Sequence, residues 1–144
     1  GLTVNRRGES CGSGHYSVPK PLGELRTLLD SRVGQRLILA GDFNLWPKDV
    51  KKVMRDSGLI DLVELTAHTR PPLEGCSGCH MGAQCGHLWT HRNGTSPNAA
   101  RQNIDYIFAS ESLVRELGSV YGGPESFPDT WEISDHAPVV AEFS

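Results

Sequence analysis

The sequence predicts an α/β fold of the α+β kind, in which one mixed and mainly antiparallel sheet is flanked by helices. Two observations predict it. Short apolar runs of strand length alternate with segments whose leucines recur at the spacing of an amphipathic helix. The chain has 144 residues, which is enough for one hydrophobic core and too few for two ordinary domains. We therefore expect a single domain over 1–144.

The first half contains two predicted helices separated by a strand. Leu22, Leu25, Leu28 and Leu29 recur at helical spacing, and Gly58 stops the second helix. Between them an apolar run of buried-strand type ends in a turn. The predicted elements are, in order, a polar loop over 1–20, a helix over 21–31, a strand over 36–40, a turn over 41–44, a helix over 49–56 and an extended run over 59–63.

The second half begins with a segment rich in Pro, Gly and Cys over 66–86. A loop of this length inside a compact domain needs something to order it. The elements predicted after it are strands over 87–91 and 103–109, a short helical turn over 111–117, an irregular stretch over 119–134 and a final strand over 137–143.

Composition narrows the classes of function. No apolar run is long enough for a transmembrane helix, so we expect no membrane segment. The net charge of −3 gives no support for a tight nucleic-acid partner, although a catalytic site can hold a phosphate through metal ions and a few local donors. Three of the four cysteines lie within ten residues, which favours metal binding over disulfides and suits the cytoplasm or another reducing intracellular compartment.

Polar residues occur at the ends of three predicted strands. Asp42 and Asn44 follow the first strand, Asp105 lies within a later one, and Asp135 and His136 precede the last. Their oxygen donors suit Mg²⁺ or Mn²⁺, and a His beside an Asp suits proton transfer or charge stabilisation. Taken singly, such a motif is more often a turn or a helix cap than a site. Their joint occurrence and their order indicate a site.

Three motifs carry a resemblance to a known family. They are Leu39-Ala40-Gly41-Asp42-Phe43-Asn44, Asn103-Ile104-Asp105-Tyr106-Ile107-Phe108 and Ser134-Asp135-His136-Ala137-Pro138-Val139. In this order they resemble the C-terminal motifs of the endonuclease/exonuclease/phosphatase (DNase I-like) superfamily, over about residues 20–144. The resemblance implies half of the family's four-layer α/β/β/α sandwich. It also implies a metal-dependent phosphodiester hydrolase, with a nuclease as the first expectation.

The resemblance implies a role for each polar residue. Asp42 would orient or deprotonate the attacking water, and Asn44 would hold the scissile phosphate. Asp135 would lie at or near a catalytic Mg²⁺ or Mn²⁺. His136 would contact the phosphate and stabilise its developing charge, and Asp105 would fix the tautomer of the His136 ring.

The family's N-terminal half has no counterpart in this sequence. In the family that half supplies an Asn and a metal-binding Glu, and Glu9 and Glu24 lie in the wrong context to replace the Glu. We therefore expect a partial domain that is inactive by itself, with the missing N-terminal half as a partner.

The cysteine-rich segment predicts a zinc-binding insertion at about 70–91. A Cys-x₂-Cys pair can clamp one Zn²⁺, and a further Cys and a His complete a tetrahedral, structural site. The expected ligands are Cys76, Cys79, Cys85 and His87, with His91 and His80 as rivals for the fourth position. The alternative is a loop with free cysteines.

The sequence leaves the substrate open. Nucleic acid is one expectation, and Trp46, which follows the Gly41–Asn44 turn, is a candidate to stack on a base or a sugar. Other phosphodiesters are the rivals, because phosphoinositide and sphingolipid phosphatases or phosphodiesterases share the superfamily. A second class of function is non-catalytic, namely a truncated half-domain that uses its zinc loop for protein or nucleic-acid contact. An Asn and a Glu at strand ends upstream in the full reading frame would favour the enzyme.

Overall fold

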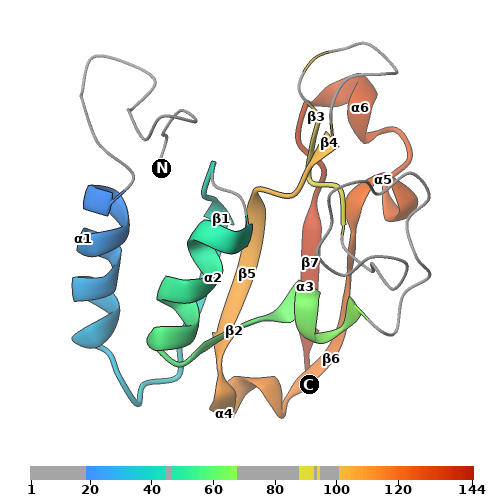
Figure 1. The fold of residues 1–144 in the computed structure, drawn as a ribbon. Helices are drawn as coiled ribbons and strands as arrows, with labels where there is room; N and C mark the ends of the chain where they lie inside the picture. The colour runs from blue at the N-terminus through green and yellow to red at the C-terminus, as the bar shows by residue number, and fades with distance from the viewer. Residues whose placement is uncertain (1–18, 45–46, 68–87, 93, 95–100) are drawn as a thin grey trace.

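The computed structural model describes residues 19–44, 47–67, 88–92, 94 and 101–144 (Figure 1). The elements are α1 (Pro19–Asp30), β1 (Ile38–Asp42), α2 (Pro47–Asp56), β2 (Leu59–Asp61), α3 (Leu62–Leu65), β3 (His91–Arg92), β4 (Arg101–Gln102), β5 (Asp105–Ser110), α4 (Glu111–Val114), β6 (Leu117–Gly122), α5 (Gly123–Ser126), α6 (Thr130–Ile133) and β7 (Val139–Phe143). The loops predicted over 1–20 and 66–86 lie almost entirely outside these ranges. Within the described ranges, none of the helices has the length and apolar character needed to cross a membrane.

Every strand pairing among the described residues is antiparallel. One sheet has the strand order β1–β5–β2, and β3–β4 and β6–β7 form two separate pairs. The predicted class, antiparallel sheet structure flanked by helices, is therefore confirmed. The single sheet that the sequence predicted is instead divided into three. Both edges of β5 are occupied by β1 and β2, so the β6–β7 pair packs against a face of β5 rather than extending its sheet.

The central strand β5 separates two hydrophobic cores. Successive side chains of a strand point to opposite faces. Tyr106 and Phe108 lie in the core that α1 and α2 cover, whereas Ile107 and Ala109 pack in the core formed with α3, α4, β6 and β7. Figure 1 shows the two helices and the β6–β7 pair on opposite sides of β5. Both faces of this strand are thus buried, which fixes its position.

Most of the regular elements lie where the sequence predicts them. The helices predicted over 21–31 and 49–56 correspond to α1 and α2, and the helical turn predicted over 111–117 contains α4. The strands predicted over 103–109 and 137–143 correspond to β5 and β7, each of which begins two residues later than predicted.

The strand before the candidate motif extends further than predicted. β1 begins at Ile38 and continues through Gly41 and Asp42, where a turn was expected, because these residues still pair with β5. The chain turns only at Phe43 and Asn44. The Phe43 N–H donates to the Ile104 carbonyl at 2.9 Å and so closes the ladder.

The extended run predicted over 59–63 is wrong at its second half. β2 ends at Asp61, whose Oδ1 accepts hydrogen bonds from the backbone N–H groups of Val63 at 2.9 Å and Glu64 at 3.2 Å. A carboxylate in this position caps a helix, and α3 accordingly begins at Leu62. The apolar run over 59–63 has no marker of this change except the Asp itself.

Two predictions after the cysteine-rich segment are also wrong. The strand predicted over 87–91 is not formed at residues 88–90, and only the last residue of that range belongs to β3. The stretch predicted to be irregular over 119–134 contains most of β6 and two short helices, α5 and α6. Sequence patterns miss β6 because Gly118 and Gly122 interrupt its alternation of apolar and polar residues. A Cβ at Gly122 would overlap the Pro138 carbonyl, so the glycine permits close packing against the start of β7.

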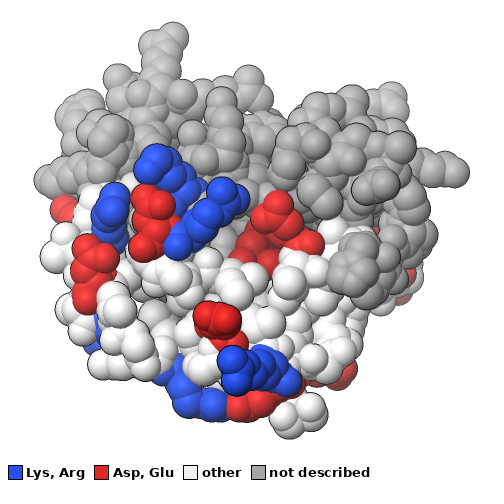
Figure 2. Space-filling view, turned by 60° about the horizontal axis from the view of Figure 1, so that its bottom comes forward, with Lys and Arg blue, Asp and Glu red and all other residues white. Residues whose placement is uncertain are grey.

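Charged side chains of both signs are mixed on the face shown in Figure 2. Among the described residues, Arg36 pairs with Glu116 at 2.7 Å, and Lys52 pairs with Asp56 at 3.1 Å. The Arg36 guanidinium lowers the pKa of the exposed Glu116 carboxyl. Such exposed pairs contribute little to stability. The described residues on this face form no extended basic surface of the kind that holds a nucleic-acid backbone.

Candidate active site

Asp42 and Asp105 lie side by side at one end of the three-stranded sheet. Asp42 is the last residue of β1, Asp105 is the first residue of β5, and the two are partners in the strand register. Partners on one face of an antiparallel pair have Cβ atoms about 4.5–5.5 Å apart. Beneath them Phe43 packs edge to face on Tyr106, with ring centroids 5.5 Å apart. The paired strands and this aromatic core therefore bring two carboxylates together.

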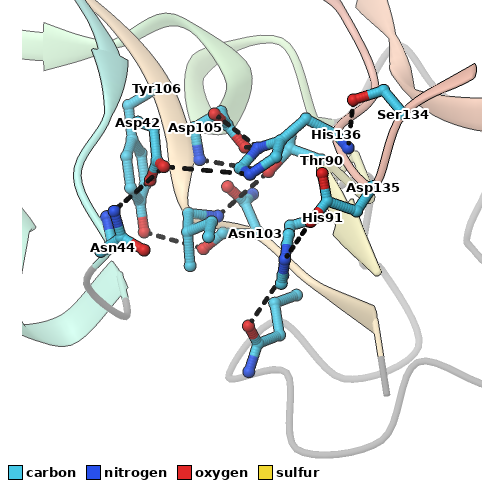
Figure 3. Close-up of polar contacts among 12 residues, drawn as sticks. Asp42, Asn44, Thr90, His91, Asn103, Asp105, Tyr106, Ser134, Asp135 and His136 are labelled. Atoms are coloured by element: carbon cyan, nitrogen blue, oxygen red, sulfur yellow. Dashed lines mark hydrogen bonds and ion pairs between the residues drawn. The ribbon is translucent and has the colours of Figure 1, made fainter. Parts of the chain in front are cut away.

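Asn44 orients the Asp42 carboxylate from the following turn. The Asn44 backbone N–H donates to Asp42 Oδ1 at 2.7 Å, and its side-chain Nδ2 donates to Asp42 Oδ2 at 3.0 Å. Asn44 has a φ of 52°, in the left-handed region that Asn adopts more readily than most residues. Both oxygens of Asp42 are thus held by one neighbouring residue (Figure 3).

His136 lies between the two carboxylates. Its Nδ1 is 3.0 Å from Asp105 Oδ2 and 3.2 Å from Asp105 Oδ1, so Nδ1 carries a proton and donates it to this carboxylate. Its Nε2 then faces the Asp42 side, 3.9 Å from Asp42 Oδ2. Figure 3 shows the ring bridging the two residues. An Asp–His pair of this kind sets the tautomer and orientation of the imidazole.

Asp105 is the most enclosed of the acidic groups in the site. Its side chain is 20% exposed, compared with 35% for Asp42 and 68% for Asp135. Burial raises the pKa of Asp105 and the charge of Asp42 adds to this effect, whereas hydrogen bonds to Thr90 and His136 oppose it. The net direction is upward, so Asp105 holds its proton more tightly than an exposed aspartate does.

Thr90 supports this arrangement from the segment before β3. Its buried side-chain Oγ1 accepts hydrogen bonds from the backbone N–H groups of Ile104 at 3.0 Å and Asp105 at 3.1 Å. Its backbone carbonyl accepts from the Ala137 N–H at 2.8 Å. One residue thus joins the start of β5 to the segment that carries His136. Sequence reasoning missed Thr90, because nothing in a Trp-Thr-His sequence indicates these contacts.

Asp135 is held by its backbone and leaves its carboxylate accessible. Its carbonyl accepts from the Arg92 N–H at 2.9 Å, and an isolated bridge pairs His91 with His136. The Asp135 carboxylate faces His91, with 3.8 Å between Oδ2 and Nε2. The 134–137 segment therefore lies along β3, which places the Asp135 carboxylate beside the rings of His91 and His136.

His91 belongs to the candidate active site in the structure. The sequence named it only as a rival zinc ligand, whereas its ring lies 4.7 Å from the His136 ring between centroids. Its Nδ1 is 3.1 Å from Gln102 Oε1 on the neighbouring strand β4. The pairing of β3 with β4 produces this contact. No sequence signal marks the pairing, because the two strands have two residues each.

Several predicted residues lie outside the described part of the chain. They are Trp46, Cys76, Cys79, His80, Cys85 and His87. The predicted zinc site and the predicted stacking role of Trp46 therefore stay predictions.

The described residues offer two overlapping groups of metal ligands. One consists of Asp42, Asp105 and His136, and the other consists of His91, Asp135 and His136. Within each group the ligand atoms lie within 4.8 Å of one another. The carboxylates of the first group, with the side-chain oxygen of Asn44 close by, fit a hard cation such as Mg²⁺ or Mn²⁺.

An open concavity of about 610 Å³ lies beside His136. Its walls come from α5, α6 and the residues on either side of α6, and they include Phe127, Pro128, Ile133 and Pro138. The ligand groups and this concavity share His136. A substrate could thus place a polar reacting group at the possible metal ligands and a less polar substituent in the concavity.

The chain belongs to the endonuclease/exonuclease/phosphatase family. The family pattern matches residues 18–136, which span α1, the paired strands and the segment that ends in Asp135 and His136. No curated protein matches the chain.

Solved structures share the fold. One is a variant of the 3′ phosphatase NExo from Neisseria bound to product DNA hairpin, with a TM-score of 0.63 and 21% identity over 96% of this chain and 58% of that one. Another is the 3′-5′ exonuclease NExo from Neisseria meningitidis, with a TM-score of 0.57 and 21% identity over 89% of this chain and 52% of that one. The chain thus spans between half and three fifths of the length of these structures.

Proposed function

We propose that this chain contributes the C-terminal part of a metal-dependent phosphodiester hydrolase that acts on nucleic acid. The observation that carries the proposal is the position of His136 between two carboxylates. Its Nδ1 donates to Asp105, and its Nε2 faces Asp42 at 3.9 Å. Membership of the endonuclease/exonuclease/phosphatase family supports the same reaction class.

Each side chain has a distinct role in this proposal. Asp42 orients and deprotonates the attacking water, because both of its oxygens are already aligned by Asn44. His136 directs Nε2 at the phosphate and stabilises the charge that develops there. Asp105 keeps the proton on Nδ1, so that the opposite nitrogen is the one presented to the substrate.

We propose Mg²⁺ or Mn²⁺ as the catalytic cofactor. When bound, such an ion neutralises phosphoryl oxygens and lowers the pKa of a water. The accessible carboxylate of Asp135 is suited to hold it, since that side chain is 68% exposed and forms no hydrogen bond among the described residues. One N–H of the Asn44 side-chain amide donates to Asp42, and the second N–H of the same Nδ2 is suited to donate to the phosphate.

Nucleic acid is the proposed substrate for two reasons. A structural relative that is a 3′ phosphatase was solved with a product DNA hairpin. The concavity of about 610 Å³ beside His136 has enough room for a nucleoside next to the reacting phosphate. Trp46, outside the described residues, is the predicted stacking partner.

The assay uses the protein expressed from the complete open reading frame that contains this chain. A DNA oligonucleotide with a 3′ phosphate and one with a 3′ hydroxyl end are incubated with Mg²⁺, with Mn²⁺ or with EDTA, because the similar structures are a 3′ phosphatase and a 3′-5′ exonuclease. We expect cleavage of at least one substrate with either metal and none with EDTA. Asp42→Asn should reduce the rate by about 10²–10⁴, the usual effect of losing a general base.

A matched substitution controls for the change of charge. Asp30→Asn alters an exposed carboxylate at the end of α1 and should leave the rate unchanged. An Asp42→Asn protein that retains full activity, or an activity insensitive to EDTA, would rule out the proposed roles. The isolated 144-residue chain should be inactive, and robust cleavage by it would show that the site is complete without further residues.

We also propose a structural Zn²⁺ in the insertion at about 70–91, held by Cys76, Cys79, Cys85 and His87. The contacts that His91 makes with Gln102 and Asp135 support His87 over His91 as the fourth ligand. Protein purified without added zinc should contain about one equivalent, because closed sites bind zinc tightly at neutral pH. Cys79→Ser should remove it. Zinc-free protein with freely reacting thiols would overturn this proposal.

A further inference from the structure

Ile133 is the most exposed of the large apolar side chains in the described part of the chain, with 86% of its surface accessible. It is the last residue of α6 and lines the concavity beside His136. A single exposed isoleucine needs no explanation by itself. The helix that carries this one is fixed to the site, however, so its exposure is a property of the folded site rather than of a loose surface segment.

Two residues fix α6 in place. Thr130 is buried, and its Oγ1 donates to the His136 carbonyl at 3.1 Å. Trp131 is held from β3, because Arg92 Nη2 donates to its carbonyl at 3.1 Å and the guanidinium lies over its ring, 5.2 Å from the centroid. Figure 1 shows α6 beside β3 and β4. With both residues anchored, Ile133 cannot turn inward without breaking these contacts.

The concavity next to Ile133 is suited to an uncharged group. Phe127, Pro128 and Pro138 contribute apolar surface to its walls. The described residues that line it include no lysine or arginine, and they include one exposed carboxylate, that of Asp129. These walls therefore do not attract a phosphate backbone. They instead offer apolar and aromatic surface to the face of a nucleobase, which packs on such surface whatever its sequence.

We propose that this concavity binds the base of the nucleotide whose phosphate reacts, and that Ile133 and Phe127 contact that base. The inference rests on the proposed function, because it takes the phosphate to lie at His136 Nε2. His136 lines the concavity and also belongs to the cluster with Asp42 and Asp105. One nucleotide thus places its phosphate at the cluster and its base against the apolar walls.

The position of the base determines which ends of a nucleic acid react well. A base enters a protein concavity only after it leaves the stack of a duplex, and this costs the least free energy when the base is unpaired. We therefore expect a higher kcat/KM for a 3′ end whose last nucleotide is mismatched than for a fully paired 3′ end.

The experiment measures binding of the base separately from turnover. The protein from the complete open reading frame, with Asp42→Asn to suppress turnover, is titrated in Mg²⁺ with a DNA duplex. The duplex carries 2-aminopurine as an unpaired last nucleotide with a 3′ phosphate. We expect a saturable change in the fluorescence of this base. The same base in the middle of the paired region should show no such change.

Ile133→Ser is the informative variant, because so exposed a side chain can be replaced without loss of the fold. It should weaken binding of the terminal 2-aminopurine duplex by about fivefold or more, the lower end of the usual effect of removing a side chain on which a base packs. In the otherwise unaltered protein it should raise KM by a similar factor and leave kcat nearly unchanged. Val33→Ser is the matched control, since Val33 is another branched apolar side chain, 71% exposed, between α1 and β1, and it should change neither quantity.

The base site and the hydrolase can fail independently. Equal effects of the Ile133 and Val33 substitutions, or no response of the terminal 2-aminopurine, would overturn the base site. Equal kcat/KM at mismatched and paired 3′ ends would overturn it as well. A protein that binds the terminal base as expected but cleaves no DNA would contradict only the hydrolase, whereas cleavage with a KM that does not depend on Ile133 would contradict only the base site.

Discussion

The β1–β5 side of the candidate site is positioned by a paired sheet, whereas the 134–137 side is positioned by individual hydrogen bonds to the segment around β3. Asp42 and Asp105 are register partners on strands whose inner faces lie in a hydrophobic core. Asp135 and His136 depend on Arg92 and Thr90, whose backbone groups hold the segment at 2.9 and 2.8 Å. We therefore expect substitutions near the 134–137 segment to displace site residues more easily than substitutions at the surface of the β1–β5 sheet.

The largest effect is expected where the two sides meet. His136→Ala removes a side chain that contacts both Asp42 and Asp105, and no other side chain in the described part of the chain does so. In the DNA assay described above, the rate should fall by about 10²–10⁴, because charge stabilisation at the phosphate is lost. The fold should persist, since the side chain is 34% exposed and belongs to neither core. An active His136→Ala protein would show that another residue supplies this stabilisation.

The sheet side can be weakened through its core. Phe108 is 1% exposed and packs against Phe43 and Tyr106. Phe108→Ala should lower the free energy of unfolding by about 3–5 kcal/mol, through lost burial and the cavity that remains. Denaturant titration measures this loss. Leu28→Ala, at a position that is 50% exposed, is the matched control and should change stability by less than about 0.5 kcal/mol.

The same comparison explains what the sequence could predict. The sheet side was predictable because apolar runs of strand length mark β1 and β5, and because the polar residues at their ends recur in a family order. Of the 134–137 side, the sequence predicts Asp135 and His136 but neither Thr90 nor His91. Both residues act through contacts with β4 and the start of β5, and a two-residue strand such as β3 has no period that a sequence pattern could detect.

In the rest of the fold, too, the elements with a sequence pattern of their own were predicted and those that depend on distant contacts were missed. Helices α1 and α2 have leucine spacing or a glycine stop, and β5 and β7 have apolar runs, so all four were predicted. β6 contains two glycines that interrupt its alternation of apolar and polar residues, so it was missed, although it pairs with β7 and buries Val120 in the core. α3 was missed because a single capping carboxylate, Asp61, converts the end of an apolar run into a helix.

A smaller effect is expected at the link between the two sides. Thr90→Val keeps the shape of a fully buried side chain but removes the oxygen that accepts from the Ile104 and Asp105 N–H groups. Two buried donors lose their partner, so unfolding should require about 1–3 kcal/mol less. Thr27→Val removes an exposed hydroxyl from α1 and should have almost no effect. Equal losses in the two variants would mean that the Thr90 oxygen is not needed as an acceptor.

The smallest effect concerns the proton on Asp105. Burial raises the pKa of this carboxyl above its ordinary value of 3.8, so the folded chain binds the proton more tightly than the unfolded chain does. Between the ordinary and the raised pKa, the folded state therefore holds more protons, and the free energy of unfolding decreases as the pH rises through this window. The group's contribution is most favourable below the ordinary pKa and is lost above the raised one.

Asp105→Asn imitates the protonated carboxyl at every pH and so removes this dependence. In EDTA, the variant should melt a few degrees above the unaltered chain at pH 7, and the difference should disappear once the pH falls below 3.8, where the native carboxyl is protonated in both states. In the DNA assay the same variant should be slower than the unaltered protein but faster than His136→Ala, because an amide oxygen still accepts from Nδ1 while the negative charge that favours this tautomer is gone. Melting temperatures of both proteins measured between pH 3 and pH 7 test the predicted difference in stability. A variant that is less stable at pH 7 would show that the ionised Asp105 contributes more through His136 and Thr90 than its burial costs.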